Sequence, residues 1–489
     1  MDAIRERLVA ILGKENVSDD PEILESFAGD RSFATPLKPW FVVKPVNAAQ
    51  VQELVKYANE VKMPLVPVSS GSPRFRGDTV PGAPQSIIVD LRGMKKILSI
   101  NRRHRMAVVE PGVTYEELLP ALAKEGMTLS MPLAPKPDKS VVASVLEVEP
   151  RLNSLHQWNY TDPLRCVEVI WGDGNRMFTG EAGGGPLDLQ KQQSAEKWQV
   201  NYAGPMMLDF YRLLTAAQGS MGIVTWASLR CEVLPQIHKL YIVPADKPED
   251  LIDFVYRVIR LRFSDELLVM NNACLAYLLG DSQDQIRRLQ AELPSWVALV
   301  GIVGRELLPE MRVEAQEKDV EEIAQQFGLK FLPTVPGANG EEVLEKLINP
   351  SVGKYWKESC KGAFQDIFFV TTLDRTPGFI NAMNSLATAA RYPAADIGVY
   401  IQPQHMGSSY HCEFIIPYNP DDAMETSRVR ELYVKASEEF SGMGAYYARP
   451  YNIWARLQIN KDAQSAIILR KLKDIFDPNG IMNPGKVSI

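Results

Sequence analysis

The 489-residue sequence contains only five cysteines, and their spacing excludes several kinds of site. They are odd in number, widely separated, and include no C-x-x-C pair. This pattern argues against a disulfide framework, a zinc ribbon and a cysteine-ligated iron–sulfur cluster. We expect most of them to be small buried apolar side chains, and they are Cys166, Cys231, Cys274, Cys360 and Cys412.

Long apolar runs, a basic excess and a targeting segment are also missing. The longest apolar stretches, such as Trp296–Val303, fall far short of the about 20 residues that a membrane-spanning helix needs. The balance of 53 Lys+Arg against 60 Asp+Glu, a net charge of −7, predicts neither nucleic acid nor an anionic membrane as the main partner. The first eight residues mix both charges, unlike a signal peptide, so we expect a cytoplasmic protein.

What the sequence does contain is enough apolar material for a large core, since 46% of its residues are hydrophobic. The N-terminal third alternates helix and strand patterns, with a helix after Asn47, a strand at 65–68 and another at 87–91. Thr114 and Glu117 form a capping box that predicts a helix start. We therefore expect α/β structure in this region.

Later segments show different patterns. Residues 166–178 read as two strands around the Gly172–Asn175 turn, which predicts a β-hairpin. The stretch 236–440 mixes amphipathic helices, at 250–263 and 310–327, with short strands, which indicates a separate α+β unit. An amphipathic helix at 463–476 precedes the C-terminal tail.

The loop after the strand at 65–68 is the first candidate binding site. Small and hydroxyl-bearing residues from Pro67 to Asp78 allow backbone N–H groups to approach a phosphate, and Arg74 or Arg76 can neutralise its charge. Such a cluster is more often an ordinary surface loop. No G-x-G-x-x-G or Walker A pattern occurs, so neither a Rossmann site nor a P-loop is supported.

The order of motifs around this loop resembles a known family. Ile88-Val89-Asp90-Leu91, Val109-Glu110-Pro111-Gly112 and Gln218-Gly219-Ser220-Met221-Gly222 follow one another, and Asn479-Gly480-Ile481-Met482-Asn483-Pro484-Gly485-Lys486 closes the chain. These segments resemble the FAD-binding flavoproteins that include p-cresol methylhydroxylase, vanillyl-alcohol oxidase and the D-lactate and glycolate dehydrogenases. The resemblance implies an α+β fold with a two-lobed FAD-binding domain at residues 1–235, a cap or substrate domain at 236–440 and a C-terminal return to the FAD domain at 441–489.

The resemblance also implies which residues hold FAD, the expected cofactor. The diphosphate would lie on the loop, with a segment near residue 140, the start of the strand at 222 and the C-terminal tail completing the site. The expected cofactor-binding residues are Pro67, Val68, Ser69, Ser70, Gly71, Ser72, Pro73, Arg74, Pro137, Ser140, Val141, Ala143, Ser144, Gly222, Ile223, Val224, Asn483, Gly485 and Lys486.

The chain departs from the family pattern at two places. Val68-Ser69-Ser70 replaces a run of glycines and Val141-Val142 replaces a glycine pair, so the backbone there is more restricted. No histidine follows Gly71, where some relatives attach FAD covalently. We therefore expect FAD that is either non-covalent or tethered from the cap.

The cap contains a histidine-rich segment. In an extended strand His411 and Glu413 share one face, with His405 a short way before them. The three could ligate a divalent metal, act as a base or substrate contact, or be ordinary strand residues. The hydroxy-acid branch of the family carries a metal site built around a turn that this chain lacks, so we predict no metal.

A tyrosine-rich segment points to the vanillyl-alcohol oxidase branch, in which a tyrosine and an adjacent arginine hold a phenolate. Tyr446 matches that tyrosine, whereas Tyr447 stands in place of the arginine and Arg449 follows two residues later. The polar cluster 156–165 adds Asp162, compared with a family aspartate near the flavin, and Arg165, which could pair with a carboxylate or a reduced flavin. A solvated turn at Asp162-Pro163 is an equally good interpretation.

The sequence thus predicts an FAD-dependent oxidoreductase that transfers a hydride from a C–H or C–OH bond of an aromatic alcohol or alkylphenol to the flavin. One alternative is a D-2-hydroxy-acid dehydrogenase subunit that passes electrons to a partner protein. The other is a non-catalytic subunit of a larger complex. We expect a homo- or hetero-oligomer with a small-molecule substrate.

Overall fold

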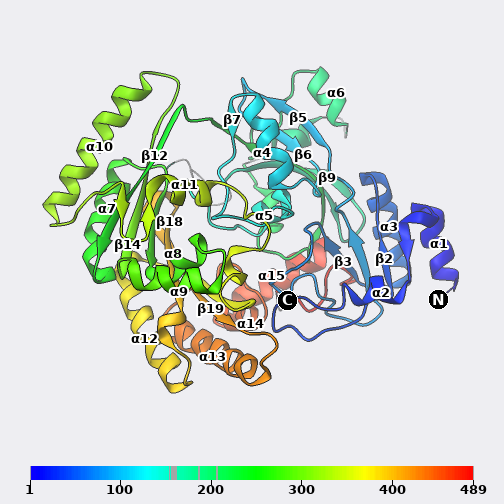
Figure 1. Cartoon of the computed structure of the whole chain (residues 1–489). Coiled ribbons are helices and arrows are strands. Elements are labelled where there is room, and N and C mark those ends of the chain that lie inside the picture. The colour runs from blue at the N-terminus through cyan, green and yellow to red at the C-terminus, as the bar shows by residue number, and fades with distance from the viewer. Residues whose placement is uncertain (1, 154, 156–161, 186–187, 205–206, 488–489) are drawn as a thin grey trace.

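The computed structural model describes residues 2–153, 155, 162–185, 188–204 and 207–487. Three main sheets carry the architecture, two in the N-terminal half and one in the middle of the chain (Figure 1). This arrangement confirms the predicted α+β fold with a two-lobed N-terminal region and a cap.

The first lobe is a four-stranded sheet in the order β1-β2-β4-β3. The strands are β1 (Val17–Ser18), β2 (Phe41–Val43), β4 (Ile87–Asp90) and β3 (Leu65–Val68), and β4 runs parallel to both β2 and β3. Helices α1 (Asp2–Leu12) and α3 (Ala48–Val61) pack on it. The side chain of Asn47 accepts the N–H of Gln50, which confirms the predicted helix start.

The second lobe is a five-stranded sheet in the order β5-β6-β10-β8-β9. Its strands are β5 (Ile97–Asn101), β6 (Met106–Val109), β10 (Gly222–Arg230), β8 (Leu164–Trp171) and β9 (Arg176–Phe178), all antiparallel. The pair β8–β9 is the predicted hairpin. The capping box at Thr114 opens α4 (Tyr115–Lys124) as predicted, and the short helix α5 (Val141–Leu146) packs in the same core.

The cap is a six-stranded antiparallel sheet whose strands all fall within residues 237–418. Its order is β12 (Ile237–Ala245), β14 (Trp296–Gly304), β13 (Leu267–Asn271), β18 (Gly398–Gln404), β19 (Ser409–Tyr418) and β17 (Ala363–Thr371). One face is covered by α7 (Ile252–Leu261), α10 (Pro309–Gln326), α12 (Thr376–Ala389) and α13 (Ala423–Gly442). On the opposite face α8 (Asn272–Leu279), α9 (Gln283–Glu292) and α11 (Gly340–Ile348) pack against a second apolar core, and α8 contacts both β13 and β18.

The C-terminal segment returns to the first lobe, as the red ribbon beside β3 shows in Figure 1. After α14 (Ile453–Ile459) and α15 (Ala463–Phe476), the chain runs parallel to β3. The N–H of Leu65 donates to the carbonyl of Ile481 at 2.8 Å, and the N–H of Asn483 donates to the carbonyl of Leu65 at 2.8 Å. Two segments more than 400 residues apart in sequence are therefore fixed edge to edge.

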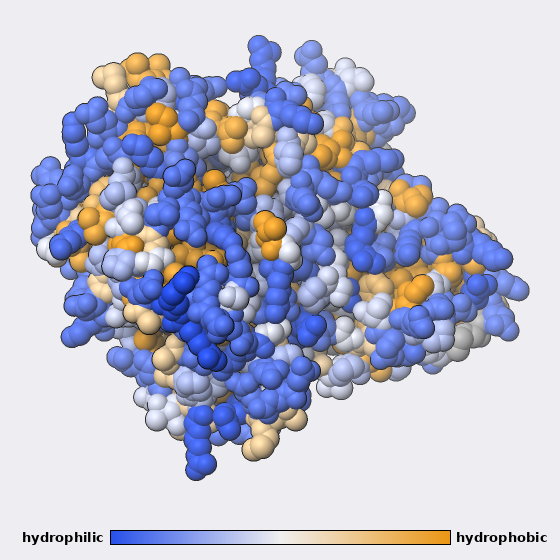
Figure 2. Space-filling model, viewed as in Figure 1, coloured by the Kyte–Doolittle hydropathy of each residue, from blue (hydrophilic) through white to orange (hydrophobic). Residues whose placement is uncertain are grey.

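The surface is mostly hydrophilic. On the face drawn in Figure 2, apolar side chains form only small scattered patches. Among the described residues no helix is long and apolar enough to cross a membrane.

Candidate active site

Two neighbouring cavities lie where the lobes and the cap meet. The first is formed by the loop after β3, by α5 and by the start of β10, and its lining includes Pro67, Val68, Ser69, Ser70, Ala143, Gly222, Ile223 and Val224. The second lies on the cap side of the same loop, and its lining includes Gly71, Pro73, Arg74, Phe75, Arg76 and Tyr355. Four residues line both cavities, so the two are adjacent spaces: Ser70, Asp78, Thr79 and Glu147.

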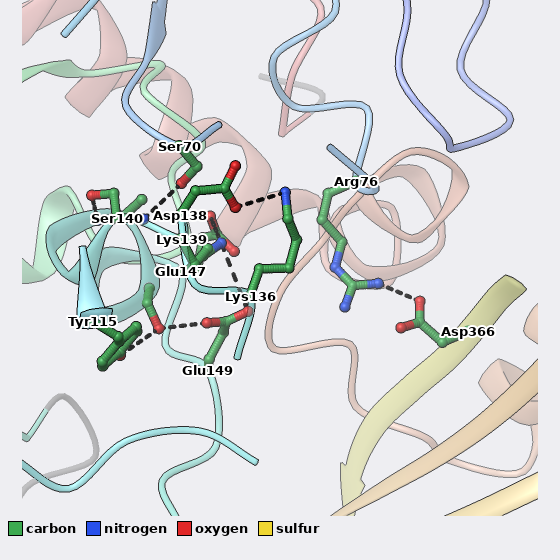
Figure 3. Close-up of polar contacts among 12 residues, drawn as sticks. Ser70, Arg76, Tyr115, Lys136, Asp138, Lys139, Ser140, Glu147, Glu149 and Asp366 are labelled. Atoms are coloured by element: carbon green, nitrogen blue, oxygen red, sulfur yellow. Dashed lines mark hydrogen bonds and ion pairs between the residues drawn. The ribbon is translucent and has the colours of Figure 1, made fainter. Parts of the chain in front are cut away.

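The loop is held by the segment that precedes α5 (Figure 3). The N–H of Ser140 donates to Ser70 Oγ at 3.1 Å, and the N–H of Gly71 donates to the carbonyl of Asp138 at 3.1 Å. A Cβ at Gly71 would lie 1.9 Å from Asp138 Oδ2, so a larger residue there would have to displace the Asp138 side chain. The loop conformation is thus set by contacts that lie outside the loop itself.

Charged side chains are buried in the second cavity. Lys139 Nζ lies 2.7 Å from Glu147 Oε1 and 3.7 Å from Glu149 Oε1 (Figure 3). Burial favours the protonated form of Glu149, but the positive charges of Lys139 and Arg449 outweigh this and lower its pKa to about 2. Glu147 Oε2 and Thr79 Oγ1 are buried and have no hydrogen-bond partner among the described residues.

Beside the second cavity, strands β18, β19 and β17 of the cap sheet carry buried polar side chains, and Arg76 of that cavity pairs with Asp366 of β17. In the register of the sheet Tyr400 pairs with Glu413, Gln402 pairs with His411, and Phe368 is the partner of Glu413 on β17. Because side chains alternate along a strand, these residues share one face. The amide of Gln402 donates to the carbonyl of Arg151, which ties this face to the second lobe.

His411 and Glu413 are joined on this face, as the two-residue spacing predicts. His411 Nε2 lies 2.8 Å from Glu413 Oε2, and Lys357 Nζ contacts Glu413 and lies 3.1 Å from Asp366 Oδ2. Burial opposes the charge of Glu413, but Lys357 and His411 hold its pKa well below the usual range. Burial lowers the pKa of His411, which favours a neutral imidazole. Nε2 then carries the hydrogen, because an ionised carboxylate only accepts.

Arg449 forms no salt bridge with another described residue, although its charge acts on Glu149 from a distance. Its side chain is 6% exposed, and its guanidinium carbon lies 3.8 Å from the centroid of the Phe368 ring. The guanidinium of Arg76 also contacts that ring, at 4.7 Å, but Arg76 is paired with Asp366 (Figure 3). Arg449 makes no hydrogen bond or ion pair with another described side chain. A buried unpaired guanidinium is expensive, so this geometry favours an anionic ligand.

Several predicted catalytic residues lie elsewhere. Tyr446 is 54% exposed, and only its backbone bonds to Val370 of β17. Tyr447 is buried, but it stacks on Trp454 at 5.1 Å and donates to the carbonyl of Ser437, so it serves the core. Placing Tyr446 and Tyr447 at the substrate is therefore not supported. His405 lies in the turn between β18 and β19 and bonds to Ser408.

No metal-binding group of three His, Cys, Asp or Glu side chains occurs among the described residues, so His405, His411 and Glu413 do not form such a trio. The reason is geometric, because His405 belongs to the turn whereas the other two belong to β19 and are occupied by Lys357 and by each other.

Asp162 and Arg165 form a separate polar group. Arg165 Nη1 lies 2.7 Å from Asp162 Oδ1, and Arg230 lies 3.9 Å from Asp162 Oδ2. Asp162 lines a small pocket with Arg151, Asn153 and Glu232 instead of either larger cavity. Asp162 therefore does not lie at the cavities predicted to hold FAD. The rest of the predicted polar cluster, residues 156–161, lies outside the described residues.

The remaining predicted cofactor residues support the cavity walls. Asn483 Nδ2 donates to the carbonyls of Asp78 and Gln218, at 2.8 and 2.7 Å, and Lys486 Nζ donates to the carbonyl of Gly77 at 2.7 Å. Ser144 Oγ accepts from Tyr115 and donates to Glu149. The others that do not line either cavity are Ser72, Pro137, Ser140, Val141 and Gly485.

Several polar residues that line the cavities were not predicted from the sequence: Lys139, Glu147, Glu149, Tyr355 and Tyr451. Nor were four buried polar residues on or against the cap sheet: Lys357, Asp366, Tyr400 and Gln402. The alternation of Tyr400, Gln402 and Gln404 along a strand was a usable signal. Lys139 and Glu147 gave no such signal, because only the folded loop brings them together.

Family comparisons agree with this geometry. Residues 39–178 match the model of an FAD binding domain, and residues 454–487 match the C-terminal domain of FAD linked oxidases. The first match contains the loop and α5, and the second contains the tail that runs beside β3.

Two similar proteins match nearly the full length of the chain, and a third matches about half of it. A probable mitochondrial D-lactate dehydrogenase of Danio rerio is 22% identical over 98% of this chain and 90% of its own length. The flavoprotein subunit of 4-cresol dehydrogenase from Pseudomonas putida is 22% identical over 98% and 94%. A 1'-carboxy-chondrochloren decarboxylase of Chondromyces crocatus is 28% identical, but over only 47% of this chain and 40% of its own length.

Two solved structures share the fold. The structure of p-cresol methylhydroxylase with substrate bound has a TM-score of 0.83 and 19% identity, covering 100% of this chain and 96% of that one. The structure of 4-ethylphenol oxidase from Gulosibacter chungangensis in complex with isoeugenol has a TM-score of 0.82 and 18% identity, covering 100% and 97%.

The residues present fit FAD. Orphaned oxygens of Thr79 and Glu147 stand at the junction of the two cavities, where a polar ligand would satisfy them. The loop and the start of β10 line the first cavity on both sides. A Cβ at Gly222 would lie 2.6 Å from the carbonyl oxygen of Ile170, so the close packing of β10 on β8 at the edge of this cavity requires glycine.

Proposed function

We propose that this chain, an FAD-linked oxidoreductase with the fold of p-cresol methylhydroxylase, oxidises an aromatic alcohol or an alkylphenol. Bound FAD supplies the two-electron acceptor for a hydride from the substrate C–H bond. The protein's own residues would bind the substrate, hold its charge and accept its proton.

The observation that carries this proposal is the unpaired Arg449 beside Phe368. An ionised phenol oxygen would supply the missing negative charge, and the substrate ring would lie among aromatic side chains. The centroid of the Phe368 ring lies 4.8 Å from that of Trp454 and 6.2 Å from that of Tyr451. Tyr451 also lines the first cavity. A phenolate donates electrons to the carbon that loses the hydride, so stabilising it favours the reaction.

His411 is the residue that we propose as proton acceptor. Its Nε2 is hydrogen-bonded to Glu413, and its Nδ1 makes no hydrogen bond to another described residue. A neutral imidazole held by a carboxylate is a suitable base near pH 7. His411 would accept the proton that a neutral phenol or alcohol loses on oxidation.

Names of the relatives support two substrate classes, since one is a cresol dehydrogenase and another a probable D-lactate dehydrogenase. Arg449 could also bind a carboxylate, so the test must separate the two. The purified flavoprotein would be mixed without oxygen with 4-alkylphenols, 4-hydroxybenzyl alcohol and D-2-hydroxy acids, and loss of the oxidised-flavin absorbance would be followed. Rapid bleaching by the phenols alone supports the proposal, whereas bleaching by hydroxy acids alone contradicts it.

We also propose that the chain works in an assembly. The Pseudomonas putida relative is the flavoprotein subunit of a 4-cresol dehydrogenase, which supports the proposal that a partner protein takes the electrons here too. Light scattering of the purified chain would report self-association. Reoxidation of the reduced flavin by air much more slowly than by a soluble one-electron acceptor would support a protein acceptor, and fast reoxidation by air would contradict it.

A further inference from the structure

The junction between the two cavities has an unusual chemical character. Of the four residues that line both, Asp78 and Glu147 carry carboxylates, and Ser70 and Thr79 carry hydroxyls. Ser70 Oγ accepts the N–H of Ser140. Glu147 Oε2 and Thr79 Oγ1 remain buried without a partner among the described residues.

Only one of the two carboxylate oxygens of Glu147 has a hydrogen-bond partner among the described residues. Lys139 Nζ lies 2.7 Å from Oε1, and the side chain is 14% exposed. A buried carboxylate oxygen without a donor costs about 1 to 3 kcal/mol or more, so such an oxygen normally has a donor in the complete protein. Among the described residues none donates to this oxygen, and a bound molecule with a donor group would satisfy it.

We infer that Glu147 and Thr79 bind the ribityl chain of FAD, the hydroxyl-bearing chain that joins the flavin ring to the diphosphate, at the point where the two cavities meet. Two features select this part of the cofactor. The carboxylates of Asp78 and Glu147 would repel a diphosphate, whereas a hydroxyl can donate to Glu147 Oε2 and exchange a hydrogen bond with Thr79 Oγ1. A linker also has to pass between the cavity that holds one end of the cofactor and the cavity that holds the other.

The inference adds a role for two residues that neither the loop motif nor the C-terminal motif contains. It rests on FAD binding alone and does not depend on the substrate class. A failure of the phenol proposal would leave it unaffected, because the test below contains no substrate.

The experiment compares ligands that differ in the linker. Full-length protein freed of flavin would be titrated with FAD, with an FAD analogue whose linker chain carries no hydroxyls, and with ADP. The variants are Glu147→Gln, which keeps the shape and removes the charge, and Thr79→Val, which replaces the hydroxyl by a methyl. Glu116→Gln is the matched control, because Glu116 is exposed on α4 and lines neither cavity.

We expect the unmodified protein to bind FAD about 10- to 100-fold more tightly than the analogue, as hydrogen bonds to a charged group predict. In Glu147→Gln and Thr79→Val the affinity for FAD falls and that for the analogue does not, so the difference shrinks. Binding of ADP stays unchanged in all variants, and Glu116→Gln behaves as the unmodified protein.

Two results would overturn the inference. One is an unchanged difference between FAD and the analogue in both variants. The other is a loss of ADP affinity as large as the loss for FAD, which would place Glu147 at the nucleotide end. If Glu147→Gln does not fold, the nearly isosteric Thr79→Val alone decides.

Discussion

The two faces of the cap sheet differ in what their burial achieves. Residues of β19 that point to the helices, such as Cys412, Phe414 and Ile416, join one continuous apolar core. Residues of the same strand that point to the lobes, His411 and Glu413, are equally buried but polar. Burying apolar surface stabilises the fold, whereas burying charges costs free energy unless each is paired. The face of the cap sheet that carries His411 and Glu413 therefore contributes less to stability than the apolar face, and its polar groups are available for binding and chemistry.

The largest expected effect comes from the central cation of the polar face. Lys357→Met leaves Glu413 and Asp366 without their common partner, and we expect the free energy of unfolding to fall by about 3 to 5 kcal/mol. Chemical denaturation would measure this loss. The double variant Lys357→Met/Glu413→Gln should lose less than the single one, and a larger loss in the double variant would contradict the charge-pairing explanation.

A change on the apolar face should cost nearly as much stability through a different cause. Phe414 is completely buried, so Phe414→Ala removes apolar contacts and leaves a cavity, and we expect a loss of about 3 to 5 kcal/mol. Below the unfolding transition, the reduction of flavin by substrate should keep its rate. A selective loss of flavin reduction in a folded Phe414→Ala protein would break the distinction between the two faces.

The unpaired guanidinium should matter for the substrate more than for the fold. In Arg449→Met we expect the rate of flavin reduction at low substrate concentration to fall about 100-fold, because a hydrogen bond to a charged group is lost. Stopped-flow absorbance would measure the rate. Arg76→Met is the contrasting variant, because Arg76 already has Asp366 as partner and its loss should destabilise the protein as well.

The polar face should also make stability depend on pH. Burial lowers the pKa of His411 below its unfolded value near 6.5, so between these two values the folded state binds fewer protons than the unfolded state. The free energy of unfolding should therefore decrease as the pH falls through about 6.5. Urea denaturation between pH 5 and 8 would measure the slope, which His411→Gln should reduce. An unchanged slope in that variant would rule out His411 as the cause.

The smallest effect is expected at Tyr446. Its side chain is 54% exposed and lies on the surface, so Tyr446→Phe should change the rate of flavin reduction by less than about 2-fold. The same measurement on Tyr451→Phe provides the comparison, because Tyr451 is buried at the first cavity. A large loss in Tyr446→Phe would restore the role that the sequence motif suggested.

Local sequence patterns predicted local structure well. Thr114 with Glu117 marked the start of α4, and the apolar spacing gave α15 with the same bounds as the structure. The period of two in a strand also placed His411 beside Glu413. These features depend on neighbours in the chain.

Contacts between distant segments were less predictable. Lys357 reaches Glu413 from a turn of 3₁₀-helix 56 residues earlier. Tyr446 matched a family motif in sequence, yet its backbone pairing with Val370 turns the side chain outward. No spacing rule encodes such long-range contacts.

The central claim is that Arg449 stabilises a phenolate on the polar face of the cap. The most direct measurement is the apparent pKa of a bound unreactive 4-halophenol, obtained from its near-ultraviolet absorbance across a pH series. The account predicts that this pKa is lower when the phenol is bound than when it is free, and that Arg449→Met abolishes the difference. An equal pKa for bound and free phenol in the unmodified protein would contradict the claim.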